Sequence, residues 1–203
     1  MLARISCALF VCAALMAGQV IEFESNGLKY QTLTKNGLTI MFAPIPSHLK
    51  GYSVLQVAAS NGSRQAFTVD PEDFVFRSDD GFQQRAMSAR AVVRRMLDKA
   101  NRNDVIKLVG AYEIGLYGLA RLQSTNGYEQ RRQSAIAELG GGKLKAAAAA
   151  SAIAFVRTKL NPGESTDGAV FYFPQGRSLG KGRLLVRAAG ETFEFEPFDL
   201  SRQ

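Results

Sequence analysis

The chain has 203 residues, of which 46% are hydrophobic and 21% are charged, and its formal net charge at pH 7 is +7. This length and composition are typical of a folded domain with its own core, and they exclude wholesale disorder and fibrous repeats. Catalytic side chains are scarce, because the sequence contains no Trp and a single His, His48. No motif names a reaction, so we expect a protein that is not an enzyme and that holds neither a cofactor nor a metal ion.

An export signal is predicted for residues 1–17. Arg4 near the start is followed by an apolar run that ends in small residues, and this order is typical of a secretory signal peptide. Its removal would also remove Cys7 and Cys12, so the mature chain would have no thiol or disulfide. If the segment were retained, residues 5–21 would form a marginal membrane anchor. We expect a cleaved signal and a periplasmic or extracellular protein.

Residues 22–81 show the pattern of short strands. Strand-like runs at 28–34 and 38–45 flank Lys35-Asn36-Gly37, and an Asn-Gly pair between two such runs is typical of a β-hairpin. A second tight turn is predicted at Asn61-Gly62-Ser63, which would join strands at 52–60 and 65–70 in another hairpin.

A further strand is predicted after the turn formed by Asp70-Pro71-Glu72-Asp73. In this strand Phe74 and Phe76 are two residues apart and therefore point to the same face. Together these short strands, separated by regular turns, favour an antiparallel sandwich.

A helical pattern replaces the strand pattern between Gln84 and Leu160, a stretch without proline. The first predicted helix has an apolar stripe of Ala89, Val92, Val93, Met96 and Ala100. Further helices are predicted at 105–122, 128–139 and 143–160, the last of them containing an alanine run of high helix propensity. The sequence Asn161-Pro162-Gly163 should end the last helix.

Strands return after Glu164. The segment that ends the chain alternates Phe193 and Phe195 with Glu194 and Glu196, so the phenylalanines should face the core and the glutamates the solvent. We predict that residues 22–81 and 162–199 are two halves of one sandwich, interrupted by a mainly helical insertion at 82–161. The halves must pair for either to bury its apolar face, since a fragment of two or three strands is only marginally stable alone.

The turn motifs of the two halves resemble those of a family of secreted bacterial immunoglobulin-like domains. They are Asn61-Gly62-Ser63, Asp70-Pro71-x-Asp73-Phe74, Asp80-Gly81 and Pro162-Gly163-Glu164-x-x-x-Gly168-x-Val170-x-Tyr172-Phe173. The resemblance implies an α+β chain built on an antiparallel immunoglobulin-like β-sandwich of the bacterial cell envelope, with no known enzymatic activity. It covers about residues 55–81 and 161–198 and leaves the insertion unexplained.

Positive charge is concentrated in the insertion. Residues 82–160 contain 14 Lys or Arg against 5 Asp or Glu, whereas the rest of the chain contains 11 against 13. The candidate binding face on the first helix consists of Arg90, Arg94, Arg95, Lys99 and Arg102. Such a face attracts phosphate or carboxylate surfaces, and it could also be a solvated face or dock against the acidic loops. No aromatic platform accompanies the charge, so no nucleic-acid partner is expected.

Other polar residues have simpler interpretations. His48 should be a solvated loop residue, and the acidic residues Asp70, Glu72, Asp73, Asp79 and Asp80 favour turns, with a calcium site left open. Asn61-Gly62-Ser63 is formally a glycosylation acceptor, although the turn alone explains it.

The sequence therefore favours an exported, non-enzymatic binding or structural module whose partner is an unknown protein or an anionic envelope surface. The alternative is a membrane-associated protein whose basic, small-residue helices contact anionic lipid. The oligomeric state and the identity of the partner stay open.

Overall fold

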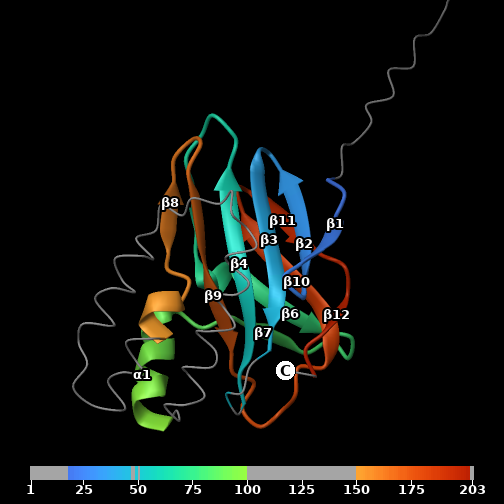
Figure 1. The fold of residues 1–203 in the computed structure, drawn as a ribbon, viewed down its shortest axis with the longest axis vertical. Coiled ribbons are helices and arrows are strands. Elements are labelled where there is room, and N and C mark those ends of the chain that lie inside the picture. The colour runs from blue at the N-terminus through green and yellow to red at the C-terminus, as the bar shows by residue number, and fades with distance from the viewer. Residues whose placement is uncertain (1–17, 47–48, 50, 100–149, 202–203) are drawn as a thin grey trace, which may run out of the picture.

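The computed structural model describes residues 18–46, 49, 51–99 and 150–201, and it is a β-sandwich (Figure 1). The first sheet has the strand order β1-β2-β3-β4-β9 and the second the order β11-β10-β6-β7, with β12 paired to β10; all these pairings are antiparallel. A small third sheet pairs β5 with β8. The helix α1 lies beside β9 and below β8 in the view of Figure 1.

The strands of the first sheet are β1 (Ile21–Ser25), β2 (Leu28–Lys35), β3 (Leu38–Ile45), β4 (Ser53–Asn61) and β9 (Ser165–Tyr172). Those of the second are β6 (Phe74–Ser78), β7 (Gln83–Arg85), β10 (Lys181–Ala188), β11 (Glu191–Glu194) and β12 (Phe198–Asp199). The remaining elements are β5 (Phe67–Val69), the short 3₁₀ helix η1 (Pro71–Asp73), α1 (Ala89–Lys99) and β8 (Thr158–Leu160).

The two halves of the sequence pair in both large sheets, as predicted. In the first sheet β4 pairs with β9 from Ser53↔Tyr172 to Ser60↔Ser165. In the second, β6 pairs with β10, where Phe76 lies opposite Leu184. Each sheet is therefore complete only when both halves are present.

The hairpin predicted at Asn36-Gly37 is confirmed, and the hairpin at Ala189-Gly190 likewise depends on residues with positive φ. Asn36 (φ 49°) and Gly37 (φ 77°) join β2 to β3, and Ala189 (φ 54°) and Gly190 (φ 73°) join β10 to β11. Positive φ at both central positions matches the twist of two-residue hairpins. Next to the second turn, Phe193 and Phe195 are buried and Glu194 is exposed, as the alternation predicted.

The predicted hairpin around Asn61-Gly62-Ser63 is wrong, because β4 pairs with β3 and β9 while β5 pairs with β8. Asn61 is fully buried and ties several loops together. Its Nδ2 donates to the carbonyls of Gln65 (2.6 Å) and Leu160 (3.0 Å), and its Oδ1 accepts from the backbone and hydroxyl of Ser63. The amide is thus fully used inside the fold, which leaves no exposed nitrogen for a glycan.

The strands β4 and β9 of the first sheet are covered on both faces. Between the two sheets, the main core includes Phe42, Leu55, Phe76 and Tyr172. On the other side of β4 and β9, a second cluster joins Val54 and Phe171 to Val92 and Met96 of α1 and to residues 150–154. This double cover explains why β4 and β9 are buried along almost their whole length.

A mainly helical insertion over 82–161 is not what the described residues show. Within that range α1 and residues 150–153 are helical, but Gln83–Arg85 and Thr158–Leu160 are strands. A helix predicted to reach residue 160 is wrong beyond Ile153, because Ala154 forms a bridge with Ala169 and the amide of Phe155 donates to the Ala169 carbonyl. The predicted signal (1–17), His48 and residues 100–149 lie outside the described residues.

The close approach of the returning chain to β9 requires Gly168. A Cβ at this position would lie 2.5 Å from the Cα of Phe155 and 2.7 Å from its nitrogen. Backbone cannot move aside as a side chain can, so we expect Gly168→Ala to lower the free energy of unfolding by about 2–3 kcal/mol in urea denaturation. Gly62→Ala is the matched control, because its Cβ would have one ordinary contact, 3.4 Å from the Gly37 carbonyl. Equal losses in the two variants would contradict this reading of the contact.

Two buried tyrosines give a paired prediction. Tyr172 is fully buried and its hydroxyl has no hydrogen-bond partner in the described structure, whereas the Tyr30 hydroxyl donates to Oε1 of Gln56 at 3.0 Å. Removing an unsatisfied hydroxyl relieves a desolvation cost, so Tyr172→Phe should leave stability unchanged or raise it by about 1 kcal/mol. Tyr30→Phe should cost about 1 kcal/mol.

The ionisation of Tyr30 gives a further prediction in alkali. Burial raises the pKa of Tyr30 to about 12, above its ordinary value near 10. A raised pKa stabilises the fold fully below pH 10, and this contribution is lost as the pH rises towards 12. Tyr30→Phe should therefore flatten the loss of stability in that range, as followed by circular dichroism. An unchanged alkaline transition in this variant would show that Tyr30 does not govern it.

Candidate functional site

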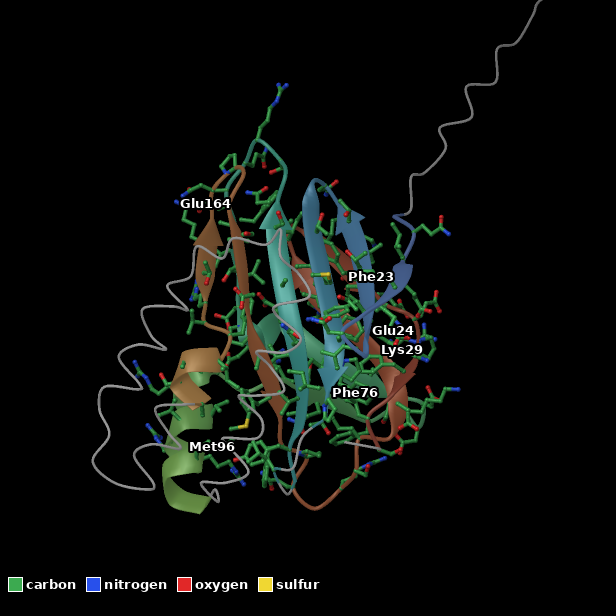
Figure 2. All side chains as sticks on the ribbon, in the orientation of Figure 1. Phe23, Glu24, Lys29, Phe76, Met96 and Glu164 are labelled. Carbon is green, nitrogen blue, oxygen red and sulfur yellow. The ribbon has the colours of Figure 1, made fainter. Side chains whose placement is uncertain are left out.

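The helix α1 separates an apolar side from a basic side. Val92 and Met96 are fully buried against the first sheet, and Met96 lies on the side of the helix that faces the strands (Figure 2). Arg90 and Arg94 are exposed and four residues apart, so they are neighbours on the outer surface of the helix. We call these two residues the arginine pair.

Arg95 has a different environment from the arginine pair. Its guanidinium carbon lies 3.4 Å from the centre of the Phe173 ring, and its Nε is buried without a hydrogen-bond partner in the described structure. It also bonds Tyr52: burial raises the pKa of the Tyr52 hydroxyl, and the charge and hydrogen bond of Arg95 oppose that rise. Arg95 therefore joins α1 to the loop after β9. Of the other predicted residues, Lys99 ends α1 and Arg102 lies outside the described residues.

The described acidic loops form ion pairs with other arginines and not with the arginine pair. Asp70 lies 3.8 Å from Arg157, and Asp80 forms an ion pair with Arg177. Within the described residues neither Arg90 nor Arg94 forms an ion pair, so both guanidinium groups face solvent.

The acidic residues of these loops serve the turns. Asp70 caps η1 by accepting from the Glu72 amide at 3.0 Å, and Asp73 accepts in return from the Asp70 amide at 3.1 Å. Asp80 accepts from the hydroxyl of Ser78 and the amide of Phe82. Among the described residues, no three His, Cys, Asp or Glu side chains are grouped so that they could hold a metal ion.

Glu194 at the end of β11 is held by two arginines. Nη2 of Arg77 lies 3.1 Å from its Oε1 and Nη1 of Arg183 lies 2.5 Å from the same oxygen. These three residues lie on neighbouring strands of the exposed face of the second sheet. The carboxylate therefore neutralises a basic row on this face.

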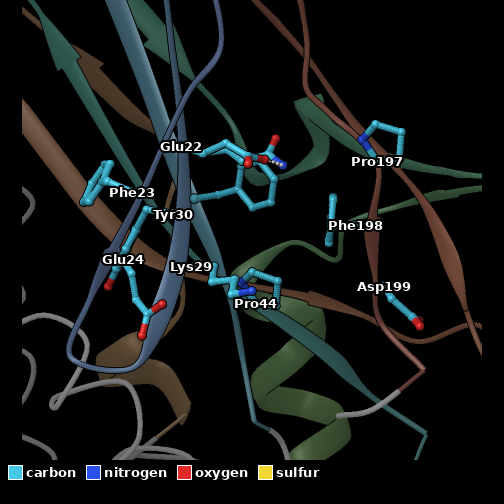
Figure 3. Close-up of a pocket in the computed structure, with 11 residues that line it drawn as sticks. Glu22, Phe23, Glu24, Lys29, Tyr30, Pro44, Pro197, Phe198 and Asp199 are labelled. Carbon is cyan, nitrogen blue, oxygen red and sulfur yellow. Dashed lines mark hydrogen bonds between the residues drawn. The ribbon is translucent and has the colours of Figure 1, made fainter.

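A pocket that the sequence did not reveal lies between the β1–β2 hairpin and the segment 197–199. Its volume is about 570 Å³, and Figure 3 shows Glu22 on one side of it and Pro197 and Phe198 on the other. Its charged lining is mainly acidic, with Glu22, Glu24 and Asp199 against Lys29. Gln31 and the ring of Phe42 complete the inner wall.

Gln31 is the polar residue at the base of this pocket, with an exposed fraction of 7%. Its Nε2 donates to the Glu22 carboxylate at 2.8 Å and to the Glu196 carbonyl at 3.3 Å. Both neighbours are acceptors, so the amide nitrogen must face them, and Oε1 remains without a hydrogen-bond partner. The sequence analysis named neither the strand β1 nor its juxtaposition with residues 197–199.

No family model, no curated protein and no solved structure matches this chain. The resemblance to secreted bacterial immunoglobulin-like domains thus stays a prediction. Within the described residues, no helix has the length and hydropathy needed to cross a membrane.

The contrast between Arg95 and the arginine pair can be tested through stability. We expect Arg95→Gln to lower the free energy of unfolding by about 1–2 kcal/mol, because it removes a partly desolvated contact with Phe173. Arg94→Gln, at the adjacent exposed position, should change it by less than about 0.5 kcal/mol. Thermal unfolding of both variants measures the difference, and equal effects would mean that Arg95 is not a packing residue.

Proposed function

We propose that this protein is a non-enzymatic exported module of the bacterial cell envelope that binds an anionic surface through the arginine pair. An immunoglobulin-like sandwich is the platform for α1 in this proposal. In its support, chain segments change sheets between β4 and β6 and between β9 and β10, as Greek-key sandwiches do. The export signal and the compartment are part of the same proposal.

The observation that carries the proposal is the division of α1 into two sides. Val92 and Met96 anchor the helix on the first sheet, so Arg90 and Arg94 project from a fixed surface and their spacing is set by one helical turn. Because neither arginine forms an ion pair with another described residue, the pair can attract phosphate and carboxylate groups without first breaking such a contact. The strong positive charge of residues 82–160 acts in the same direction.

Binding to anionic vesicles tests the proposal. The exported protein should co-sediment at low salt with vesicles of phosphatidylcholine and phosphatidylglycerol, and it should not with phosphatidylcholine alone. Each basic residue near such a surface contributes about 1 kcal/mol, so the double variant Arg90→Gln/Arg94→Gln should bind about thirtyfold more weakly.

The matched control is Arg64→Gln/Arg187→Gln, which removes the same charge from two exposed arginines outside α1. This control should bind nearly as well as the original protein. If both double variants lost binding equally, net charge rather than the arginine pair would be responsible. A parallel measurement with an anionic polysaccharide separates the two sources of negative charge: binding to vesicles alone would favour the membrane-associated alternative.

A further inference from the structure

We propose that the edge strand β1 and the adjacent acidic pocket form a second binding site, which takes an extended peptide segment with alternating basic and apolar side chains. The peptide pairs with β1 as an added strand, and one of its Lys or Arg side chains enters the pocket. This site is separate from the arginine pair of α1 and goes beyond the function proposed for it.

The charge of the pocket favours a cationic ligand. Its lining contains the carboxylates of Glu22, Glu24 and Asp199 against the single cation Lys29. A cationic N–H group donates charge-assisted hydrogen bonds to such carboxylates and balances their charge. The rings of Phe42 and Phe198 supply an apolar wall for the stem of a long side chain, and their centroids are 4.9 Å apart.

The strand β1 has a free edge in the described structure, because it pairs with β2 and with no other described strand. Among the described residues, the large hydrophobic side chains that are exposed both lie on β1: Ile21 has an exposed fraction of 60% and Phe23 of 38%. Phe23 stacks on Tyr30 at 5.2 Å between ring centres, so an apolar side chain of an added strand would extend this stack. Exposed edges of this kind are templates for strand addition.

The two faces of β1 define the sequence of the partner. Phe23 is opposite Tyr30 on the outer face, whereas Glu22 is opposite Gln31 on the face of the pocket. An added strand alternates in the same way, so its apolar residues would cover Ile21 and Phe23 and its basic residues would meet Glu22 and Glu24. One peptide with alternating apolar and basic residues can therefore contact both the apolar face and the acidic face of β1.

A second copy of this chain does not fit the same edge. In an antiparallel β1–β1 pair centred on residue 22, 23 or 24, a glutamate of one copy lies opposite a glutamate of the other. Like charges directly opposite each other are destabilising, so the occupant must be a chain of opposite charge.

A synthetic peptide with the alternating sequence Lys-Val-Arg-Val-Lys-Val-Thr tests the proposal. We expect saturable binding to the exported protein by fluorescence anisotropy, with amide chemical shifts changing along Ile21–Ser25. The variant Glu22→Gln/Glu24→Gln should weaken binding about tenfold, as the loss of two partly exposed charge pairs implies. The control Glu72→Gln/Asp79→Asn removes two exposed carboxylates elsewhere and should bind normally.

Two further measurements separate strand addition from simple charge attraction. The same peptide with N-methyl groups on alternate residues keeps its charge but cannot pair along β1, so it should not bind. Arg90→Gln/Arg94→Gln should leave peptide binding unchanged, which keeps this test distinct from that of the arginine pair. Equal binding of the N-methylated peptide, or equal loss in the two carboxylate variants, would overturn the proposal.

Discussion

The pairing of β4 with β9 is the interaction on which the rest of the structure depends. It joins the two halves of the sequence in the middle of the protein, and both strands are buried on both faces. A strand with two buried faces needs two apolar covers, and these are the second sheet on one side and α1 with residues 150–154 on the other. The helix is therefore part of the core, and the exposure of Arg90 and Arg94 follows from the burial of Val92 and Met96.

Local turn chemistry and alternation were enough to predict much of the fold. The hairpins at Asn36-Gly37 and Gly190 and the inward phenylalanines of β6 and β11 depend on neighbouring residues alone, and each could be predicted. The partner of β5 could not, because the amide of Asn61 and the arrival of β8 decide it from distant parts of the chain. In the same way, the bridge between Ala154 and Ala169 ends a helix that the alanine run alone would continue.

The candidate sites also combine residues that local sequence patterns identify with residues that only the tertiary structure brings together. Helical spacing identified Arg90 and Arg94, but the next residue, Arg95, packs on Phe173 of a distant strand end, which no periodicity reveals. The acidic pocket combines residues from both ends of the described chain, so no local sequence pattern could predict it. The two surfaces have opposite charge and lie on different elements, one on a helix over β9 and the other at the β1 edge of the same sheet (Figure 1).

The long reach of the central strand pair has a consequence for biosynthesis. Every residue pair between β4 and β9 joins positions more than half of the chain's length apart. During translation, β9 is synthesised long after β4. The edge of β4 that pairs with β9 therefore stays unpaired until the second half of the chain has emerged. Non-local topologies of this kind fold slowly, because the entropy of closing a long loop is lost before the strand pairing compensates for it.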